Sequence, residues 1–144
     1  MQNTEPTQPR RRFERISLAL PVRVEAKENK EASWNEVTRF YNVSQCGAGF
    51  EVKRQIKVGQ LVQLTSPIPQ KLRCYDYSED QYRVWGIVRY CTPSKKNADC
   101  FFTGVAFIGK NPPASYHEDP SRLYGLLFSN KLGFFELAEG NRDV

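Results

Sequence analysis

The sequence predicts an all-β protein built on a closed barrel of six antiparallel strands. Six short segments between residues 17 and 108 are rich in apolar side chains, and turn-forming Gly, Pro, Asn or Asp residues lie between most of them. Several segments repeat apolar side chains at every second position, as expected for strands with one buried face. Closure leaves no long strand edge exposed, and a chain of 144 residues with 40% hydrophobic residues fits one such domain.

The first predicted strand, residues 17–25, shows the alternation most clearly. Its apolar side chains share one face and are Leu18, Leu20, Val22 and Val24. The next eight residues carry four charges and no apolar side chain larger than alanine, which predicts a loop. A half-buried strand followed by a polar loop is typical of an antiparallel barrel.

The second predicted strand, residues 35–44, does not alternate cleanly. Val37, Tyr41 and Val43 share the face expected to point inward, but Arg39 lies on that face as well. Either a β-bulge interrupts the strand or Arg39 reaches the mouth of the barrel.

Three more strands follow from short apolar runs at residues 48–53, 60–65 and 101–108. Val58-Gly59 is expected to turn the chain into the second of these runs. The polar residues 66–81 are expected to form a long surface loop.

The longest predicted strand, residues 82–92, carries a tryptophan on its outer face. Val84, Val88 and Tyr90 share the inward face, whereas Trp85 lies on the outer face among arginines. Trp85 is either part of a contact surface or packed under the C-terminal segment, because large aromatic side chains usually find cover.

Near the C-terminus the spacing of apolar side chains changes from that of a strand to that of a helix. Asp119 and Pro120 suit the N-cap and the first position of a helix, and three leucines at helical spacing follow: Leu123, Leu126 and Leu127. We therefore expect a short C-terminal helix that ends at Gly133. An apolar cluster comes after it and consists of Phe134, Phe135 and Leu137. Helix and cluster either cover the barrel or dock a partner.

Positive charge is concentrated at the N-terminus. Residues 1–9 predict a disordered lead-in, and residues 1–24 hold five arginines against two glutamates, a net charge of +3 out of the formal +5. By itself such a cluster indicates a solvated tail that attracts anions. No apolar run approaches eighteen residues and no signal-peptide pattern is present, so we expect a cytoplasmic protein without membrane insertion.

Few residues suit catalysis or metal binding. The four cysteines, at positions 46, 74, 91 and 100, contain no C-x-x-C pair, and the only histidine is His117. Reduced structural thiols are expected, with a metal site as the alternative. Ser44 has no neighbouring base in the sequence and His117 lies outside every motif, so we do not expect an enzyme.

A short polar stretch, Asn42-Val43-Ser44-Gln45-Cys46-Gly47, lies between two apolar runs. The period of two puts Asn42 and Ser44 on one face. Gly47 suits a turn with positive φ or the close approach of a ligand. An Asx or serine turn that caps a hairpin is the alternative. A second stretch upstream, Arg10-Arg11-Arg12-Phe13-Glu14-Arg15, favours a ligand site.

Together the two stretches resemble the PilZ domain, a bacterial receptor module for cyclic di-GMP. The motifs of that family are R-x-x-x-R and [D/N]-x-S-x-x-G, and the matching residues are Arg11 and Arg15, preceded by Arg10, and then Asn42, Ser44 and Gly47. Asn42 stands where aspartate is commoner. The resemblance implies a six-stranded barrel with a flexible N-terminal arm over residues 10–110. Residues 111–144 follow it as the segment for which the helix and tail are predicted.

The resemblance also implies how cyclic di-GMP would bind. Arg11 and Arg15 would contact the phosphates and the guanine edges, with Arg10 as a supplementary contact that can serve a second stacked ligand. The Asn and Ser of the second motif would hydrogen-bond a guanine, and its Gly would let the backbone turn beneath the ligand. The arm would close over the barrel and signal to a downstream protein partner, without a cofactor or a metal.

Two other functions remain open from the sequence. A small basic barrel with an arginine arm can bind RNA or single-stranded DNA through stacked bases. The net charge of +2 over residues 25–144 predicts no extended phosphate track, so nucleic acid is the less favoured partner. The chain could also be a PilZ-like adaptor that works through protein contacts.

Overall fold

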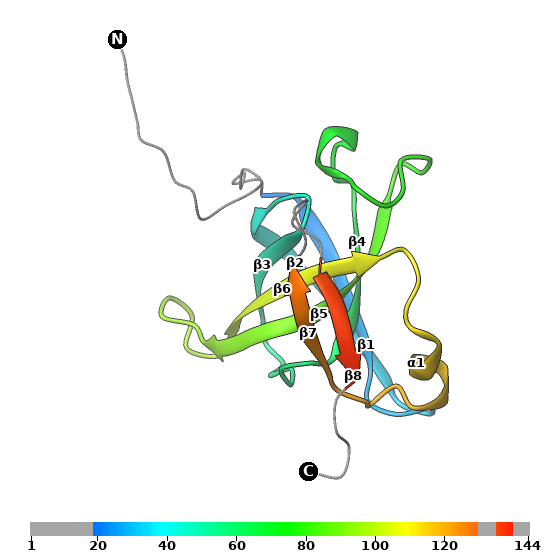
Figure 1. Cartoon of the computed structure of the whole chain (residues 1–144). Helices are drawn as coiled ribbons and strands as arrows, with labels where there is room; N and C mark the ends of the chain where they lie inside the picture. Colours follow the sequence, from blue (N-terminus) through cyan, green and yellow to red (C-terminus); the bar gives the residue numbers. More distant parts are fainter. Residues whose placement is uncertain (1–18, 130–134, 140–144) are drawn as a thin grey trace.

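The structure, a computed structural model, describes residues 19–129 and 135–139 and confirms the predicted barrel (Figure 1). Six strands form it: β1 (Pro21–Lys27), β2 (Ser33–Val43), β3 (Gly47–Val52), β4 (Leu61–Ser66), β5 (Tyr82–Pro93) and β6 (Phe101–Gly109). Neighbouring strands are antiparallel, and the order β1-β2-β3-β6-β5-β4 returns to β1. The sheet is therefore closed.

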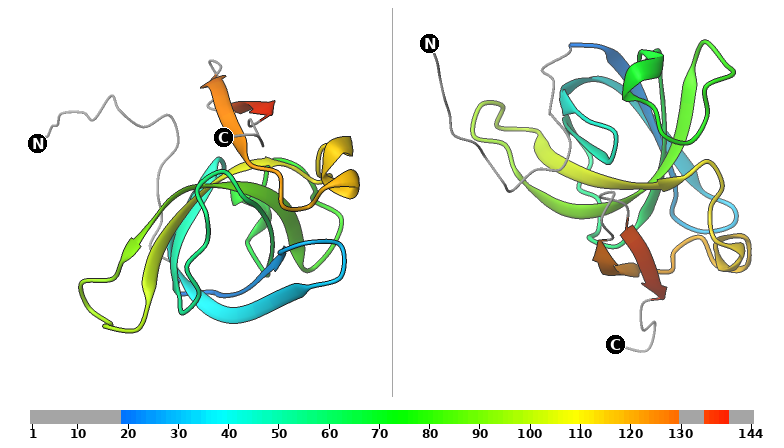
Figure 2. Two further views of the ribbon diagram at one scale, coloured as in Figure 1. Left: turned by 90° about the horizontal axis from the view of Figure 1, so that it is seen from below. Right: turned by 45° about the horizontal axis from the view of Figure 1, so that its top comes forward.

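Apolar side chains from all six strands fill the barrel. Fully buried side chains of the strands in this interior include Val22, Val24, Val43, Phe50, Val52, Val62, Leu64, Tyr82, Val84 and Phe107. Each fully buried aliphatic or Phe side chain contributes about 1.5–3 kcal/mol, so this interior is the main source of stability. The view along the barrel in Figure 2 (left) shows the strands around a common interior, with the C-terminal strands outside it.

The segment between β4 and β5 is largely irregular and exposed, as its polar composition predicts, but part of it is buried. It contains the short 3-10 helix η1 (Gln70–Leu72), and Ile68 and Leu72 are buried in the barrel core. Arg73 is also buried, and its guanidinium group donates hydrogen bonds to the backbone carbonyl oxygens of Ile68, Asp76, Glu79 and Asp80. One arginine therefore organises the polar backbone of this segment.

A β-bulge explains the irregular pattern of β2. Phe40 pairs with Phe50 of β3, and Asn42 pairs with the next residue back along β3, Gly49. Two steps along β2 thus match one step along β3, which leaves one extra residue in β2.

The bulge reverses the alternation of side chains within β2. Phe40 and Val43 are both buried, whereas Val37 and Tyr41 are exposed, so the predicted inward orientation of the latter two was wrong. Arg39 is exposed as well and donates a hydrogen bond from Nη1 to the carbonyl oxygen of Ala19 (2.5 Å). Of the two explanations offered by the sequence, the bulge is correct.

The C-terminal segment contains a short helix, but not at the predicted place. The helix α1 (Ala114–Glu118) comes before Asp119, and the residues expected to be helical form β7 (Tyr124–Ser129), which pairs with β8 (Phe135–Glu139). The carboxylate of Asp119 accepts hydrogen bonds from the backbone nitrogen and the hydroxyl group of Ser121, as in an Asx turn. Pairing between strands overrides the helical spacing of the leucines.

Gly59 joins this C-terminal segment to the barrel. Its backbone nitrogen donates to the carbonyl oxygen of Val88, and its carbonyl oxygen accepts from the backbone nitrogen of Tyr124, both at 2.8 Å. Gly59 has a φ of +95°, and a Cβ atom there would lie 2.7 Å from the carbonyl oxygen of Tyr124. The predicted turn at Val58-Gly59 is confirmed, and only glycine fits it without strain.

The C-terminal segment covers part of the outer face of the barrel. Side chains from β4, β5 and β6 are buried there with two tyrosines of the C-terminal segment; they are Leu61, Ile87, Ala106, Tyr116 and Tyr124. Trp85 packs against Tyr116 in an edge-on arrangement with ring centroids 4.9 Å apart. Trp85 is therefore covered rather than part of an open contact surface.

Helices contribute little to the described part of the chain. The helices α1 and η1 have five and three residues. Neither combines the length and the apolar character that crossing a membrane requires. The side chains of the predicted apolar cluster, Phe134, Phe135 and Leu137, lie outside the described residues.

Candidate functional site

The polar stretch singled out in the sequence forms the tight turn between β2 and β3. Asn42 is the penultimate residue of β2, and Gly47 begins β3. The backbone nitrogen of Ser44 donates to the carbonyl oxygen of Gly47 (2.9 Å), which closes the turn. Arg10, Arg11 and Arg15 lie outside the described residues, so the structure describes only the second of the two motifs.

The side chain of Ser44 stabilises this turn. Its hydroxyl oxygen accepts a hydrogen bond from the backbone nitrogen of Cys46 (3.3 Å) and donates to the carbonyl oxygen of Gly47 (3.4 Å). Only 4% of Ser44 is exposed. These contacts are those of a serine turn, so Ser44 shapes the backbone that presents Asn42.

Gly47 is required by close packing between strands. Among the described glycines, only Gly59 and Gly109 have positive φ, so the turn does not need a left-handed backbone at Gly47. A Cβ atom on Gly47 would lie 2.5 Å from the carbonyl oxygen of Val105 in β6. The group that approaches Gly47 closely in the structure is therefore the backbone of the neighbouring strand β6.

Replacing Gly47 with alanine is expected to lower the free energy of unfolding by about 1–3 kcal/mol, because the backbone must move to admit the methyl group. Gly125→Ala is the matched control, since a Cβ atom there would meet nothing within 4 Å. Urea denaturation followed by circular dichroism measures both variants. Equal midpoints for Gly47→Ala and the wild type would contradict this explanation of the glycine.

Asn42 begins a row of four residues across the outer face of the barrel. The register pairs Asn42 with Gly49, Gly49 with Gly104, and Gly104 with Tyr90, on β2, β3, β6 and β5 in turn. The neighbours of Gly49 in β3 are core residues, so Gly49 faces outward. Gly49 and Gly104, which we call the glycine floor, thus lie side by side between the amide of Asn42 and the ring of Tyr90.

A second β-bulge, in β5, places Tyr90 on this face. Val88 pairs with Val105 and Tyr90 pairs with Gly104, so Arg89 is an extra residue in β5. Tyr90 is 39% exposed, and a Cβ atom on Gly104 would overlap its ring. The predicted inward orientation of Tyr90 was wrong because this bulge changes the alternation.

Sequence reasoning missed three aromatic side chains around the glycine floor: Tyr41, Tyr90 and Phe102, which we call the aromatic shelf. The ring of Phe102 lies between the tyrosines, with centroids 5.4 Å from Tyr41 and 5.9 Å from Tyr90. A Cβ atom on Gly49 would lie 3.1 Å from Phe102 Cζ and 3.3 Å from Asn42 Oδ1. The shelf therefore adjoins Asn42. The irregular alternation of β2 was the one sequence signal that pointed to it.

The hairpin between β5 and β6 is anchored beside the aromatic shelf. The carboxylate of Glu51 accepts hydrogen bonds from the hydroxyl group of Ser94 and the amide of Asn97, and these bonds, Ser94 first, hold the pKa of Glu51 below its usual value. The Ser94 hydroxyl oxygen accepts from the backbone nitrogens of Lys96 and Asn97 (both 3.1 Å). The hairpin holds Lys96 Nζ 5.3 Å from the centroid of the Tyr41 ring.

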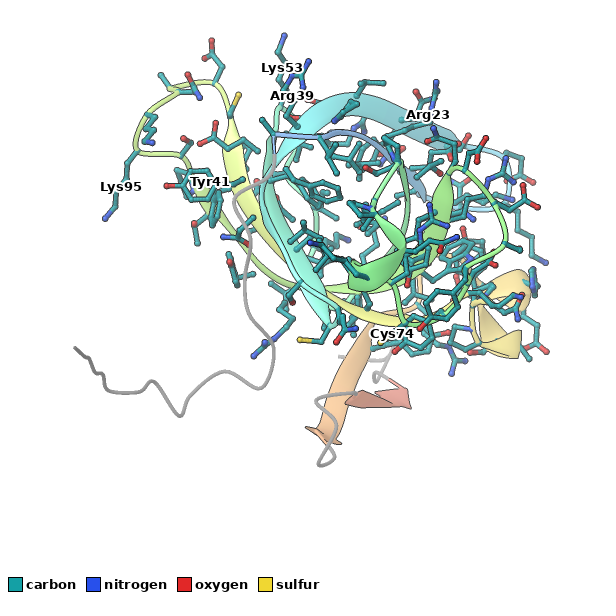
Figure 3. All side chains as sticks on the ribbon, turned by 90° about the horizontal axis from the view of Figure 1, so that it is seen from above. Arg23, Arg39, Tyr41, Lys53, Cys74 and Lys95 are labelled. Atoms are coloured by element: carbon teal, nitrogen blue, oxygen red, sulfur yellow. The ribbon has the colours of Figure 1, made fainter. Side chains whose placement is uncertain are left out.

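The N-terminal arm joins the barrel close to this surface. The backbone nitrogen of Phe40 donates to the carbonyl oxygen of Leu20 (3.0 Å), and Arg39 contacts the carbonyl oxygen of Ala19. Residues 19 and 20 therefore run beside β2 immediately before Tyr41 and Asn42. Figure 3 shows Arg39 and Tyr41 on the side of the barrel that also carries the projecting β5–β6 hairpin.

The cysteines are free thiols that form no metal site within residues 19–129. All four are partly exposed, and burial raises the pKa of the Cys74 thiol, with a smaller contribution from Cys46. No group of three or more Cys, His, Asp or Glu side chains in the described ranges is arranged to hold a metal ion. The candidate site therefore consists of the Asn42 turn, the glycine floor and the aromatic shelf.

Comparison with known proteins supports the fold and identifies a family. The family model described as the PilZ domain matches residues 9–120. The chain is also similar to a solved structure of the Bacillus subtilis Inhibitor of motility (MotI/DgrA), with a TM-score of 0.52 and 17% sequence identity. That match covers 77% of this chain and 47% of the other, so this chain spans about half the length of its structural relative. No curated protein matches the chain.

Proposed function

Because the chain belongs to the PilZ domain family, we propose that it is a bacterial receptor for cyclic di-GMP that signals to a downstream protein. The observation that supports this most strongly is the position of Asn42. It lies on the outer face at the end of a tight turn, two residues along β2 from the point where the N-terminal arm joins the barrel. A ligand held there would lie close to the point where the N-terminal arm joins the barrel.

Cyclic di-GMP presents two phosphates and two guanines, and the chain offers groups that match them. Arg11 and Arg15 would bind phosphate and guanine edges, because a guanidinium group can donate two parallel hydrogen bonds and stack on a base. The amide of Asn42 can both donate and accept, as a guanine edge requires. Ser44 and Gly47 contribute by holding the turn in shape.

The length of the arm suits this arrangement. Arg15 precedes Ala19 by four residues and Arg11 precedes it by eight, so an extended chain spans about 13–14 Å and 26–29 Å respectively. Both arginines can therefore reach Asn42 from the point where the arm joins β2. Arg10 lies one residue further and would contact a second stacked ligand, which predicts two molecules of cyclic di-GMP per chain.

Calorimetric titration tests the proposed function directly. Cyclic di-GMP should bind in preference to GTP, cyclic di-AMP and a short single-stranded RNA, and the fitted stoichiometry distinguishes one bound ligand from two. No heat with cyclic di-GMP at high micromolar concentration would overturn the proposal.

RNA or single-stranded DNA is the second candidate ligand, and the aromatic shelf is the observation that favours it. Exposed aromatic rings on a barrel surface stack bases with little regard to sequence. Preference for RNA over cyclic di-GMP in the same titration would support this candidate. In either case the protein is proposed to act by binding rather than by catalysis.

Binding of cyclic di-GMP is expected to protect the arm from trypsin. Apart from Met1, residues 1–15 contain only one large apolar side chain, Phe13, too little to offset an ordering cost of about 1–2 kcal/mol per residue without a ligand. Cleavage after Arg10, Arg11, Arg12 or Arg15, followed by mass spectrometry, should be fast in the free protein and slow in the complex. Equal rates would mean that the ligand does not change the arm, and the signal would have to arise elsewhere.

A further inference from the structure

The aromatic shelf is a partly exposed group of rings next to the turn that carries Asn42: Tyr90 is tilted by 31° from the plane of Phe102, and Tyr41 meets Phe102 edge-on at 84°. Tyr41 is 55% exposed and Tyr90 is 39% exposed, and Phe102, half-buried between them, contacts both rings. The C-terminal segment, which covers Ile87 and Ala106 on the same outer face, leaves these tyrosines open to solvent. Adjoining exposed aromatic rings are typical of a binding surface.

The glycine floor fixes the orientation of the shelf. Because a Cβ atom on Gly104 would overlap the ring of Tyr90, that ring lies directly on the backbone, with its other face turned outward. Phe102 is held in the same way above Gly49, beside the amide oxygen of Asn42. Rings that are fixed before binding lose little conformational entropy when a ligand stacks on them.

Polar groups flank the shelf on two sides. Asn42 lies at one side, and Lys96 covers the Tyr41 ring from the β5–β6 hairpin at the other. Lys96 is held there by the hydrogen bonds between the hairpin and Glu51, whereas Lys95, at the tip of the same hairpin, points away from the barrel (Figure 3). An aromatic surface between an amide and a cation matches the base and phosphate of a nucleotide better than an apolar peptide.

We propose that the aromatic shelf is the stacking site for one guanine of the bound dinucleotide and that Lys96 contacts the adjoining phosphate. This inference rests on the proposed function and adds side chains from outside both motifs to the site. Asn42 then hydrogen-bonds the edge of a base whose face lies on the shelf.

Titration of the full chain with cyclic di-GMP tests the stacking site. Tyr90→Leu should weaken binding roughly 5- to 100-fold, the range that corresponds to loss of one base–aromatic stack. Tyr41→Ala should weaken binding as well, because Tyr41 packs edge-on against Phe102 and its ring lies beside Lys96. Tyr77→Ala is the control, because Tyr77 is 54% exposed in the segment between β4 and β5 and is not part of the strands that carry the shelf. Circular dichroism establishes that each variant is folded before it is titrated.

Lys96→Gln and Lys95→Gln provide a matched pair, since each removes one positive charge from the same hairpin. Only Lys96→Gln should weaken binding and reduce its dependence on salt concentration. An independent readout is the proton NMR signal of guanine H8, which should move upfield when the base stacks on a ring. That shift should be smaller with Tyr90→Leu than with the wild type.

The outcomes separate the two proposals. Binding of cyclic di-GMP by the wild type, with affinities of Tyr41→Ala and Tyr90→Leu equal to that of Tyr77→Ala, would overturn the stacking site and leave the proposed function standing. Equal effects of the two lysine variants would overturn the role of Lys96. No binding by the wild type would overturn the proposed function itself, and the stacking site for guanine with it.

Discussion

Replacing Arg11 or Arg15 with alanine is expected to weaken the binding of cyclic di-GMP roughly ten- to hundredfold. Loss of a charge-assisted bidentate contact costs about 1.5–3 kcal/mol, whereas loss of a distant, screened charge costs a few tenths. Replacing both arginines should abolish measurable binding. Isothermal titration calorimetry on the full chain gives the dissociation constants.

The control for these variants is Lys30→Ala, which removes one positive charge from the exposed turn between β1 and β2. Equal losses for Arg11→Ala, Arg15→Ala and Lys30→Ala would indicate nonspecific electrostatic attraction and favour the nucleic-acid candidate.

Arg73→Lys is expected to lower the free energy of unfolding by roughly 2–4 kcal/mol, although it keeps the positive charge. The guanidinium group of Arg73 serves four backbone carbonyl oxygens at once and lies 5.2 Å from the centroid of the Tyr82 ring. A single ammonium group cannot reach all four oxygens, so part of this buried backbone loses its hydrogen bonds. Urea denaturation measures the change.

Lys71→Ala is the control for Arg73, because its side chain is exposed in the same segment. It should leave the midpoint of unfolding almost unchanged. If Arg73→Lys were as stable as Lys71→Ala, the segment would be held by the apolar contacts of Ile68 and Leu72 rather than by the arginine.

The barrel could be predicted from the sequence because its strands and turns have patterns that extend over only a few residues. Val22 and Val24 recur with a period of two in β1, and the turn at Gly59 depends on one residue type. The position of the C-terminal helix could not be predicted in this way. Whether residues 124–129 form a helix or a strand is decided by pairing with the following strand β8 and by the bond from Tyr124 to Gly59, which is distant in the sequence.

The motif identified in the sequence located the candidate turn but did not reveal how its residues act. Ser44 and Gly47 match a ligand-binding pattern, yet their described contacts stabilise the turn and the packing of β3 on β6. Tyr41 and Tyr90 were assigned to the interior because a single extra residue in each strand inverts the expected alternation. A bulge depends on the partner strand, so neither inversion is encoded in one strand alone.

The same two bulges determine how this surface can change during evolution. In β2 two residues lie between Phe40 and Val43, whose side chains are buried in the core. In β5 two residues likewise lie between Val88, which is buried in the core, and Cys91, which packs against it. One extra residue in each strand thus adds a side chain to the outer face and leaves the order of interior side chains intact. Substitutions of Tyr41 can alter which ligands the face accepts while selection on the core continues to preserve the barrel. Related domains can therefore differ in the ligands that they bind while each of them keeps the same folded barrel.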